Sequence, residues 1–202
     1  MLDGVLSSFT AGQRQRLAEA RVGIAGAGGL GSNVAMMLAR SGVEHLLIID
    51  GDIVEPSNLN RQHYFPVHVG RPKVDALAEQ LLALNADMKV DARALWLKRE
   101  HLPALLEEAE LWIEALDDAA TKALFASAAM AAKTPVICAS GMGGFGGSAM
   151  KRRRMGLLTV VGDMKTDVSS LPPLAPRVMQ CAAMQADAAL EWLLTGTIKE
   201  LL

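Results

Sequence analysis

The sequence predicts an α/β fold, a Rossmann-like, mostly parallel sheet flanked by helices, with antiparallel strands toward the C-terminus. Short apolar runs alternate with segments of helical periodicity, which is the pattern of repeated strand–helix–strand units. A glycine-rich stretch at residues 26–31 follows the first apolar run and opens a helical pattern. The length of 202 residues suits one domain with a substantial core, so we assign residues 1–202 to a single domain.

The first strand, expected at about residues 21–26, runs into a turn with the spacing G-x-G-x-x-G. Its three glycines are Gly26, Gly28 and Gly31, and Gly29 stands where the following helix begins, a helix expected to reach residue 40. This spacing allows a tight turn, close approach of the backbone to a phosphate, and close packing of the helix on the strand. The N–H groups at the helix start favour an anion, so the stretch predicts a nucleotide phosphate site.

The second strand, at residues 46–49, ends in Asp50, about 20 residues beyond the turn. A carboxylate at that distance is placed to hold a ribose hydroxyl. It argues against the alternative that the glycine turn belongs to an α/β domain that binds nothing. Up to this point the sequence also suits a nicotinamide dehydrogenase.

The polar segment at residues 51–62 argues against a dehydrogenase. Arg61 has no evident use beside a dinucleotide, whereas a guanidinium can hold the phosphate oxygens of a nucleoside triphosphate in a bidentate way. Lys73 falls in the first turn of a helix expected from Pro72 to about Asn85. A cation is unfavourable there unless an anion shares the site, so Lys73 also indicates phosphate binding.

The fourth strand, at residues 111–115, runs into Asp117 and Asp118. Because the carboxyl ends of parallel strands line the ligand crevice, these carboxylates are expected near the triphosphate. We assign Mg²⁺ binding to Asp117, and capping of the helix at residues 119–132 to Asp118.

The rest of the chain carries two segments of open interpretation. The glycine-rich segment at residues 141–147 is either a flexible loop or a place where another backbone approaches closely. The basic run at residues 151–154 is expected to be a solvated stretch, with contact to an acidic partner protein as the alternative. The remaining expected elements are helices at 7–20, 100–108 and 177–194, strands at 89–95, 135–139 and 157–161 (the last antiparallel), and a loop at 162–176.

Composition excludes several classes of protein. The net charge of −2 gives no electrostatic case for nucleic acid or a membrane surface, and no apolar run is long enough to span a bilayer. No secretory leader is recognisable, and two cysteines, Cys138 and Cys181, suit a reducing compartment, so a cytoplasmic location is expected. The histidines are expected on the surface or in loops, without metal-ligand spacing: His45, His63, His68 and His101.

Five motifs, in this order, resemble the ThiF/MoeB family of adenylating enzymes, which is related to the ubiquitin-activating enzymes. They are Gly26-x-Gly28-Gly29-Leu30-Gly31, Asp50-x-Asp52, Ser57-Asn58-Leu59-Asn60-Arg61-Gln62, Gly70-x-Pro72-Lys73 and Asp117. The Asn-x-x-Arg-Gln element is far more specific than the glycine motif. The similarity spans residues 20–150, and the tail is similar to the short ThiF proteins of thiamine biosynthesis.

The resemblance implies adenylation, with Mg²⁺ and ATP, of the C-terminal carboxylate of a ThiS-like sulfur carrier of ubiquitin fold, in a homodimer and in thiamine biosynthesis. It implies catalytic roles for Arg61, Lys73 and Asp117, with Asp117 as the metal ligand. The nucleotide-binding residues that it implies are Gly26, Gly28, Gly29, Gly31, Asp50, Asp52, Asn58, Arg61, Gln62 and Lys73.

The sequence departs from the family pattern in its cysteines. The C-x-x-C pairs of larger relatives are absent, so no zinc is expected, and neither cysteine falls in an obviously mobile loop. Some members extend an N-terminal arginine to the partner's site, and whether Arg14 or Arg16 does so stays open.

Two alternative functions remain. One alternative is a tRNA-base cyclising dehydratase, against which the acidic net charge stands. The other is a non-catalytic nucleotide-binding module, against which the intact Arg61, Lys73 and Asp117 set stands.

Overall fold

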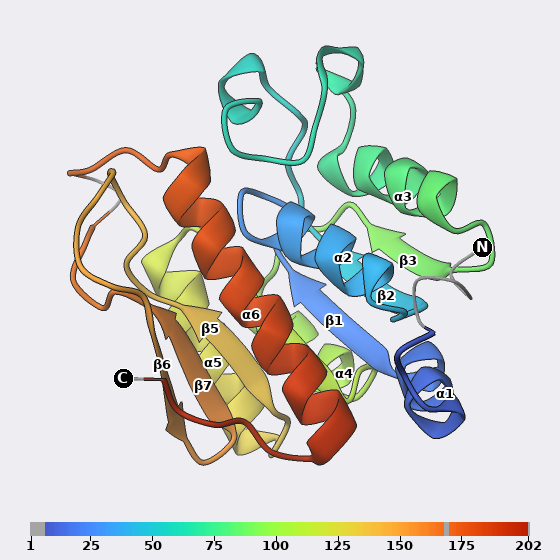
Figure 1. Cartoon of the computed structure of the whole chain (residues 1–202). Coiled ribbons are helices and arrows are strands. Elements are labelled where there is room, and N and C mark those ends of the chain that lie inside the picture. Colours follow the sequence, from blue (N-terminus) through green and yellow to red (C-terminus); the bar gives the residue numbers. More distant parts are fainter. Residues whose placement is uncertain (1–6, 168–169, 202) are drawn as a thin grey trace.

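A seven-stranded sheet with helices on both faces forms the centre of the molecule (Figure 1). The computed structural model describes residues 7–167 and 170–201; the N-terminal residues 1–6 and positions 168–169 of the predicted loop lie outside the described residues. The strand order is β3-β2-β1-β4-β5-β7-β6, and every pair is parallel except β6 with β7. This arrangement confirms the predicted fold class. The strands are β1 (Arg21–Ala25), β2 (His45–Ile49), β3 (Lys89–Arg93), β4 (Leu111–Glu114), β5 (Val136–Ala139), β6 (Lys151–Met155) and β7 (Leu158–Gly162).

The described residues form six α-helices and three 3-10 turns; α1 precedes the first strand and α6 follows the last. The α-helices are α1 (Ala11–Glu19), α2 (Gly31–Arg40), α3 (Lys73–Leu84), α4 (Leu102–Leu106), α5 (Ala119–Ala131) and α6 (Ala175–Thr195). The 3-10 turns are at Pro56–Asn58, Pro66–His68 and Arg99–His101. Helices α2 and α6 pack side by side on one face of the sheet, and α4 and α5 lie behind it (Figure 1). In the described ranges no helix is both long and apolar enough to cross a bilayer.

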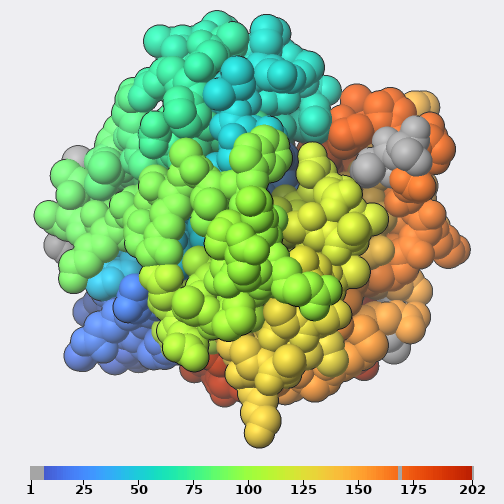
Figure 2. Space-filling model, turned by 180° about the vertical axis from the view of Figure 1, so that it is seen from behind, coloured from blue at the N-terminus to red at the C-terminus, as the bar shows by residue number. Residues whose placement is uncertain are grey.

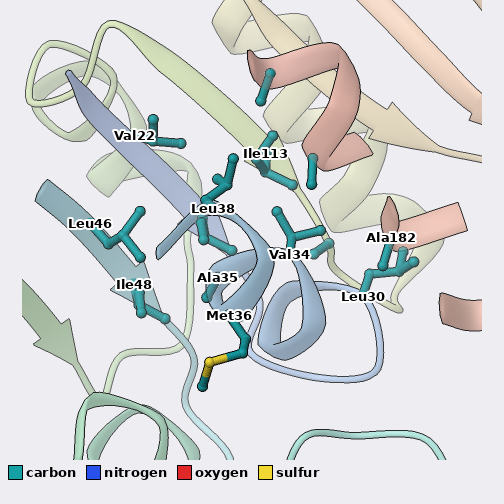
Figure 3. Close-up of a cluster of buried hydrophobic side chains, with 14 of the residues drawn as sticks. Val22, Leu30, Val34, Ala35, Met36, Leu38, Leu46, Ile48, Ile113 and Ala182 are labelled. Carbon is teal, nitrogen blue, oxygen red and sulfur yellow. The ribbon is translucent and has the colours of Figure 1, made fainter. Parts of the chain in front are cut away.

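Alternating side chains of the central strands supply two separate cores. In β2, for example, Leu46 and Ile48 pack against the helices of the α2 and α6 face, whereas Leu47 and Ile49 pack against those of the opposite face. Figure 3 shows the first core, where Leu38 and Val34 of α2 meet these strands. A strand buried on both faces must be apolar throughout, which explains the unbroken runs in the sequence.

The C-terminal strands depart from the expectation. The basic run at residues 151–154 forms part of β6, antiparallel to β7, while β7 is itself parallel to β5. Arg153 and Arg154 are exposed, as expected of a solvated run, but Arg152 is not. Arg152 is buried there, and its guanidinium pairs with Asp187 at 3.0 Å and Glu191 at 2.8 Å on α6. A basic residue can enter the interior because carboxylates from a distant helix meet it.

Helix α6 begins two residues earlier than predicted. Pro176 was expected to exclude a helix, but it stands in the first turn of α6, where a missing N–H costs no hydrogen bond. At the other end, Gly196 adopts a left-handed φ of 73° and closes the helix.

The start of α2 is pressed against the turn that precedes it. A Cβ atom added to Gly31 would stand 1.8 Å from the carbonyl oxygen of Gly26, and Gly26 itself has a φ of +101°. Both positions therefore require glycine, for close approach in one case and for backbone conformation in the other.

We predict that Gly31→Ala lowers the free energy of unfolding by about 1–3 kcal/mol, because the methyl group must displace the turn. Gly12→Ala is the matched control, since no atom lies within 4 Å of the added Cβ. That change in α1 should be neutral or stabilise by up to about 1 kcal/mol. Urea unfolding of the two variants measures the difference, and equal stabilities would contradict the packing argument.

Candidate active site

A cavity of about 480 Å³ opens at the carboxyl edge of the sheet. It lies where the strand order reverses around β1 and β4, the position at which open α/β sheets bind ligands. From behind, Figure 2 shows the segment near residue 95 standing beside the start of α5, with a narrow opening between them. The wall includes Gly26, Gly28, Gly29, Asp50, Asp52, Arg61, Gln62, Lys73, Leu95, Trp96, Leu97, Leu116, Asp117, Ala119, Thr121, Lys122 and residues of the 139–142 segment.

The carboxylate of Asp50 joins the ends of β1 and β2. One oxygen accepts a hydrogen bond from the backbone N–H of Ala27 in the glycine turn, and the other accepts one from Asp52, both at 2.7 Å. The turn is thereby held in place by the residue for which the sequence predicts a ribose contact. Because each carboxylate oxygen has two acceptor sites, Asp50 keeps capacity for a ligand hydroxyl.

These hydrogen bonds belong to a closed ring of contacts. The side chain of Asp52 pairs with Lys73 Nζ at 2.7 Å, and the buried Tyr64 hydroxyl lies 3.2 Å from the Lys73 carbonyl oxygen and 2.7 Å from that of Ala27. Burial, helped by the charge of Asp50, raises the pKa of Tyr64, so its hydroxyl stays a donor. The ring links the glycine turn, the end of β2 and the start of α3. Sequence reasoning missed Tyr64, which carries no motif.

Of the three cationic residues in the cavity wall, Arg61 and Lys73 are the ones that the sequence predicts, and Lys122 is the third. Lys73 is almost fully buried and held by Asp52, whereas Arg61 is partly exposed. The Arg61 guanidinium donates to the Ser57 carbonyl oxygen at 3.1 Å and to Asn60 Oδ1 at 2.8 Å. Both cations are therefore positioned by groups of their own chain, in a site suited to a polyanion.

Helix α2 and Gln62 supply further groups for a ligand. The helix begins without a side-chain cap, and Gly28, Gly29 and Leu30 just before it line the cavity, where N–H groups at a helix start favour an anion. The Gln62 side chain lines the cavity, and its buried Oε1 has no hydrogen-bond partner. A buried acceptor without a partner is costly, so a ligand donor at this position would be stabilising.

Asp117 and Asp118 follow β4 and have different roles. Asp118 caps a helix, as the sequence predicts. That residue caps α5 by accepting the backbone N–H of Thr121 at 2.7 Å, and hydrogen bonds from Thr121 lower its pKa. Asp117 is exposed and lines the cavity. Mg²⁺ commonly binds to one or two carboxylates, substrate phosphates and water, so Asp117 fits the residue that would hold it. Within residues 7–167 and 170–201 no group of three or more potential ligands is assembled for a metal site formed by protein alone.

An ion pair that the sequence analysis missed fixes the backbone before Asp117. Glu114 is buried, and its Oε1 accepts hydrogen bonds from Lys122 Nζ and from the backbone N–H of Leu116, both at 2.8 Å. Lys122 also donates to the Leu116 carbonyl oxygen at 3.0 Å. A carboxylate inside an apolar strand run is the signal that could have revealed it, because a buried charge needs a partner.

Two of the predicted binding residues are absent from the cavity wall. Gly31 serves the packing of α2 on the turn. Asn58 is buried in the 3-10 turn, where its Oδ1 accepts the backbone N–H of Glu55 at 3.0 Å. This contact shapes the segment that presents Arg61, and the phosphate contact of Asn58 stays a prediction.

The glycine-rich segment is a place of close approach. A Cβ atom on Gly141 would stand 2.1 Å from Asp163 Oδ1, and one on Gly143 would stand 2.5 Å from the Leu171 carbonyl oxygen. The buried Arg177 pairs with Asp163 and donates to the carbonyl oxygens of Gly146 and Ser148. Of the two interpretations of residues 141–147, the structure favours close approach of another backbone over a flexible loop.

Polar residues outside the cavity have local roles. The guanidinium of Arg16 binds the Glu110 carboxylate through two hydrogen bonds of 2.9 and 2.6 Å, and Arg14 donates to the Phe9 carbonyl oxygen at 2.5 Å. His68 lies in the connection between β2 and α3, as the loop alternative expects, but it is buried there in a 3-10 turn and accepts the Phe65 N–H at 3.0 Å.

Both cysteines are buried, in agreement with the structural role expected for them. Burial raises the pKa of Cys181 to about 12 and raises that of Cys138 as well. Cys181 lies with its sulfur 3.7 Å from the Val161 carbonyl oxygen. Neither environment favours the thiolate.

We predict that both thiols of the folded protein resist 5,5′-dithiobis(2-nitrobenzoic acid) at pH 8. Their labelling should be at least ~100-fold slower than in guanidinium chloride, since only the thiolate reacts and only when accessible. Absorbance at the thionitrobenzoate band measures both rates. Rapid release of one equivalent from the folded protein would contradict the structural role.

Known proteins are similar to this chain in sequence. The sequence matches the ThiF family over residues 4–201. The sulfur carrier protein ThiS adenylyltransferase of Escherichia coli K12 is 37% identical over 138 residues, which is 68% of this chain and 55% of that protein. The protein of the same name from Bacillus subtilis 168 is 32% identical over 193 residues, 91% of this chain and 56% of that protein. The chain thus spans about half the length of these relatives.

Solved structures share the fold. The E. coli tRNA N6-threonylcarbamoyladenosine dehydratase TcdA in complex with ATP superposes with a TM-score of 0.86 at 20% identity, covering 96% of this chain and 93% of that one. E. coli MccB in complex with AMPCPP and MccA gives a TM-score of 0.72 at 22% identity, covering 93% and 64%. At these identities the likeness establishes the Rossmann-like fold.

Proposed function

This chain belongs to the ThiF family, and we propose that it transfers the adenylyl group of ATP to the C-terminal carboxylate of a ThiS-like sulfur carrier, releasing pyrophosphate. One observation carries the proposal: the glycine turn, Arg61, Lys73 and Asp117 all line one cavity. Two relatives named ThiS adenylyltransferase, at 37% and 32% identity, support this choice of acceptor.

The cavity suits a nucleoside triphosphate better than a dinucleotide. Its volume of about 480 Å³ is in the range of small-molecule sites. Arg61, Lys73 and the uncapped start of α2 offer separate groups of donors for the phosphates of a triphosphate, whereas a dinucleotide has only two phosphates. Asp50, beside the glycine turn, accepts a ribose hydroxyl in this proposal.

The chemistry requires no nucleophile from the protein. A carboxylate oxygen of the carrier attacks the α-phosphorus, the bond from that phosphorus to the bridging oxygen breaks, and pyrophosphate leaves with the electron pair. Arg61 and Lys73 hold the phosphate oxygens and offset the charge that develops on them. When bound, Mg²⁺ neutralises further charge, and Asp117 is the residue that would hold it. The ring of contacts through Asp50 and Lys73 keeps the glycine turn and Lys73 in place before the substrate arrives.

The setting of the reaction follows from the same family. We propose a homodimer that acts in the cytoplasm, in thiamine biosynthesis. Two unpaired, buried cysteines are compatible with a reducing compartment. The thiols take no part in adenylation.

A second candidate acceptor is a carboxylate on a modified tRNA base. The observation that favours it is the match to TcdA, which covers 93% of that chain, compared with 55% and 56% of the two ThiS adenylyltransferases. The net charge of −2 argues against a nucleic-acid substrate. Both candidates use one reaction, the adenylation of a carboxylate, and differ in the surface that the acceptor contacts.

We predict that Arg61→Ala and Lys73→Ala each slow ATP–pyrophosphate exchange by at least ~10²-fold, the scale of losing one preorganised donor. Asp117→Asn should raise the Mg²⁺ concentration needed for half-maximal exchange, because a neutral amide binds a hard cation poorly. Arg71→Ala is the matched control: it precedes α3, pairs with the exposed Glu79 and is absent from the cavity wall.

Exchange is measured with purified ThiS-like carrier and, separately, with tRNA. Carrier-dependent exchange in the wild type and in Arg71→Ala, lost in the first two variants, is the expected result. Near wild-type rates in Arg61→Ala, Lys73→Ala and Asp117→Asn would place the chemistry elsewhere. Exchange stimulated by tRNA and not by the carrier would favour the second candidate.

A further inference from the structure

We propose that the indole of Trp96 is the surface on which the base of the nucleotide stacks. The inference rests on the proposed binding of a nucleoside triphosphate and deepens it, because it names the group that recognises the base. Trp96 is one of three tryptophans in the chain, and no sequence motif includes it.

The backbone brings Trp96 next to the predicted ribose contact. Strand β3 ends at Arg93, and the chain then leaves the sheet at its carboxyl edge. Asp50 N–H donates to the Arg93 carbonyl oxygen and Leu95 N–H donates to the Asp50 carbonyl oxygen, both at 3.2 Å. These two bonds hold the segment from Leu95 to Leu97 beside Asp50, in the cavity wall. A base attached to a ribose at Asp50 would be within reach of it.

One face of the indole is already seated on backbone. A Cβ atom on Gly51 would stand 2.5 Å from the indole carbon Cδ2, so the ring lies against Gly51 and any side chain at this position would have to displace it. Gly51 does not have a positive φ, and its conformation alone therefore does not require glycine. The indole of Trp96, in this position, is what favours glycine at residue 51. Gly51 and Trp96 therefore fit each other.

The rest of the indole is open. Trp96 is 65% exposed, whereas Trp112 is fully buried in the core behind the sheet. None of the aromatic rings in the described part of the chain packs against Trp96. A large apolar surface left uncovered in a cavity wall is a place where a ligand gains free energy by covering it.

The wall near Trp96 contains apolar side chains that a base can contact. Leu97, Leu116 and Ala119 line the same cavity, although the polar residues Asp117, Asp118, Thr121 and Lys122 line it too, and Arg61 and Lys73 come from other segments. A stacked base fits beside the apolar side chains, and a polyphosphate fits beside Arg61 and Lys73. Stacking accepts any base, but a purine covers more of an indole than a pyrimidine does. The inferred ligand class is therefore a purine nucleoside triphosphate.

The test compares Trp96→Ala and Trp96→Phe with wild type by calorimetry, using ATP, UTP and inorganic tripolyphosphate as ligands. Trp96→Ala should raise the Kd for ATP about 5- to 150-fold, the range for removing one stacking partner. Trp96→Phe should keep the Kd within about threefold of wild type, because a stacking ring remains. Tripolyphosphate has no base, so its Kd should not change, and the preference for ATP over UTP should shrink in Trp96→Ala.

Phe145→Ala is the control variant, since Phe145 is also an exposed aromatic residue, at 88%, but is absent from the cavity wall. ATP binding that is unchanged in Trp96→Ala would overturn the inference and leave the proposed function standing. An equal loss of ATP and tripolyphosphate affinity would overturn it too, because the effect would then be a distortion of the cavity. Failure of the wild type to bind ATP would instead overturn the proposed function on which the inference rests.

Discussion

The carboxylate of Asp50 is the group on which the site depends. Its two hydrogen bonds, to the N–H groups of Ala27 and Asp52, close the edge of the sheet between β1 and β2. The ring continues through Lys73 and Tyr64 and returns to the glycine turn. Loss of Asp52 would leave the buried Lys73 ammonium without its partner, and loss of Asp50 would release the glycine turn. These contacts therefore hold the turn, Lys73 and the start of α3 in one geometry.

This constraint suits a reaction that proceeds by positioning. Adenylyl transfer needs the α-phosphorus and the attacking oxygen to be aligned, with positive charge in place before they meet. A lysine fixed by Asp52 and an arginine fixed by Ser57 and Asn60 meet that need without a conformational search. The buried Glu114 and Lys122 pair does the same for the backbone that carries Asp117.

The sequence predicts local features well and distant partnerships poorly. Gly31 and the Asp118 cap follow from rules that act within a few residues. Strand β6 was missed because burial of Arg152 depends on Asp187 and Glu191, which lie 35 and 39 residues further along the chain. The sequence did not indicate Trp96 either, because the position of its indole depends on contact with Gly51, which is distant in the sequence. The predicted phosphate contact of Asn58 has no support in the cavity wall.

The central claim is that the glycine turn serves a triphosphate held by Arg61 and Lys73, and not a nicotinamide dinucleotide. Isothermal calorimetry of the wild-type protein with Mg·ATP, and in parallel with NAD⁺ and NADH, tests it most directly. We predict saturable one-site binding of Mg·ATP and no detectable heat from either dinucleotide. Tight binding of NAD⁺ or NADH with no response to ATP would contradict it.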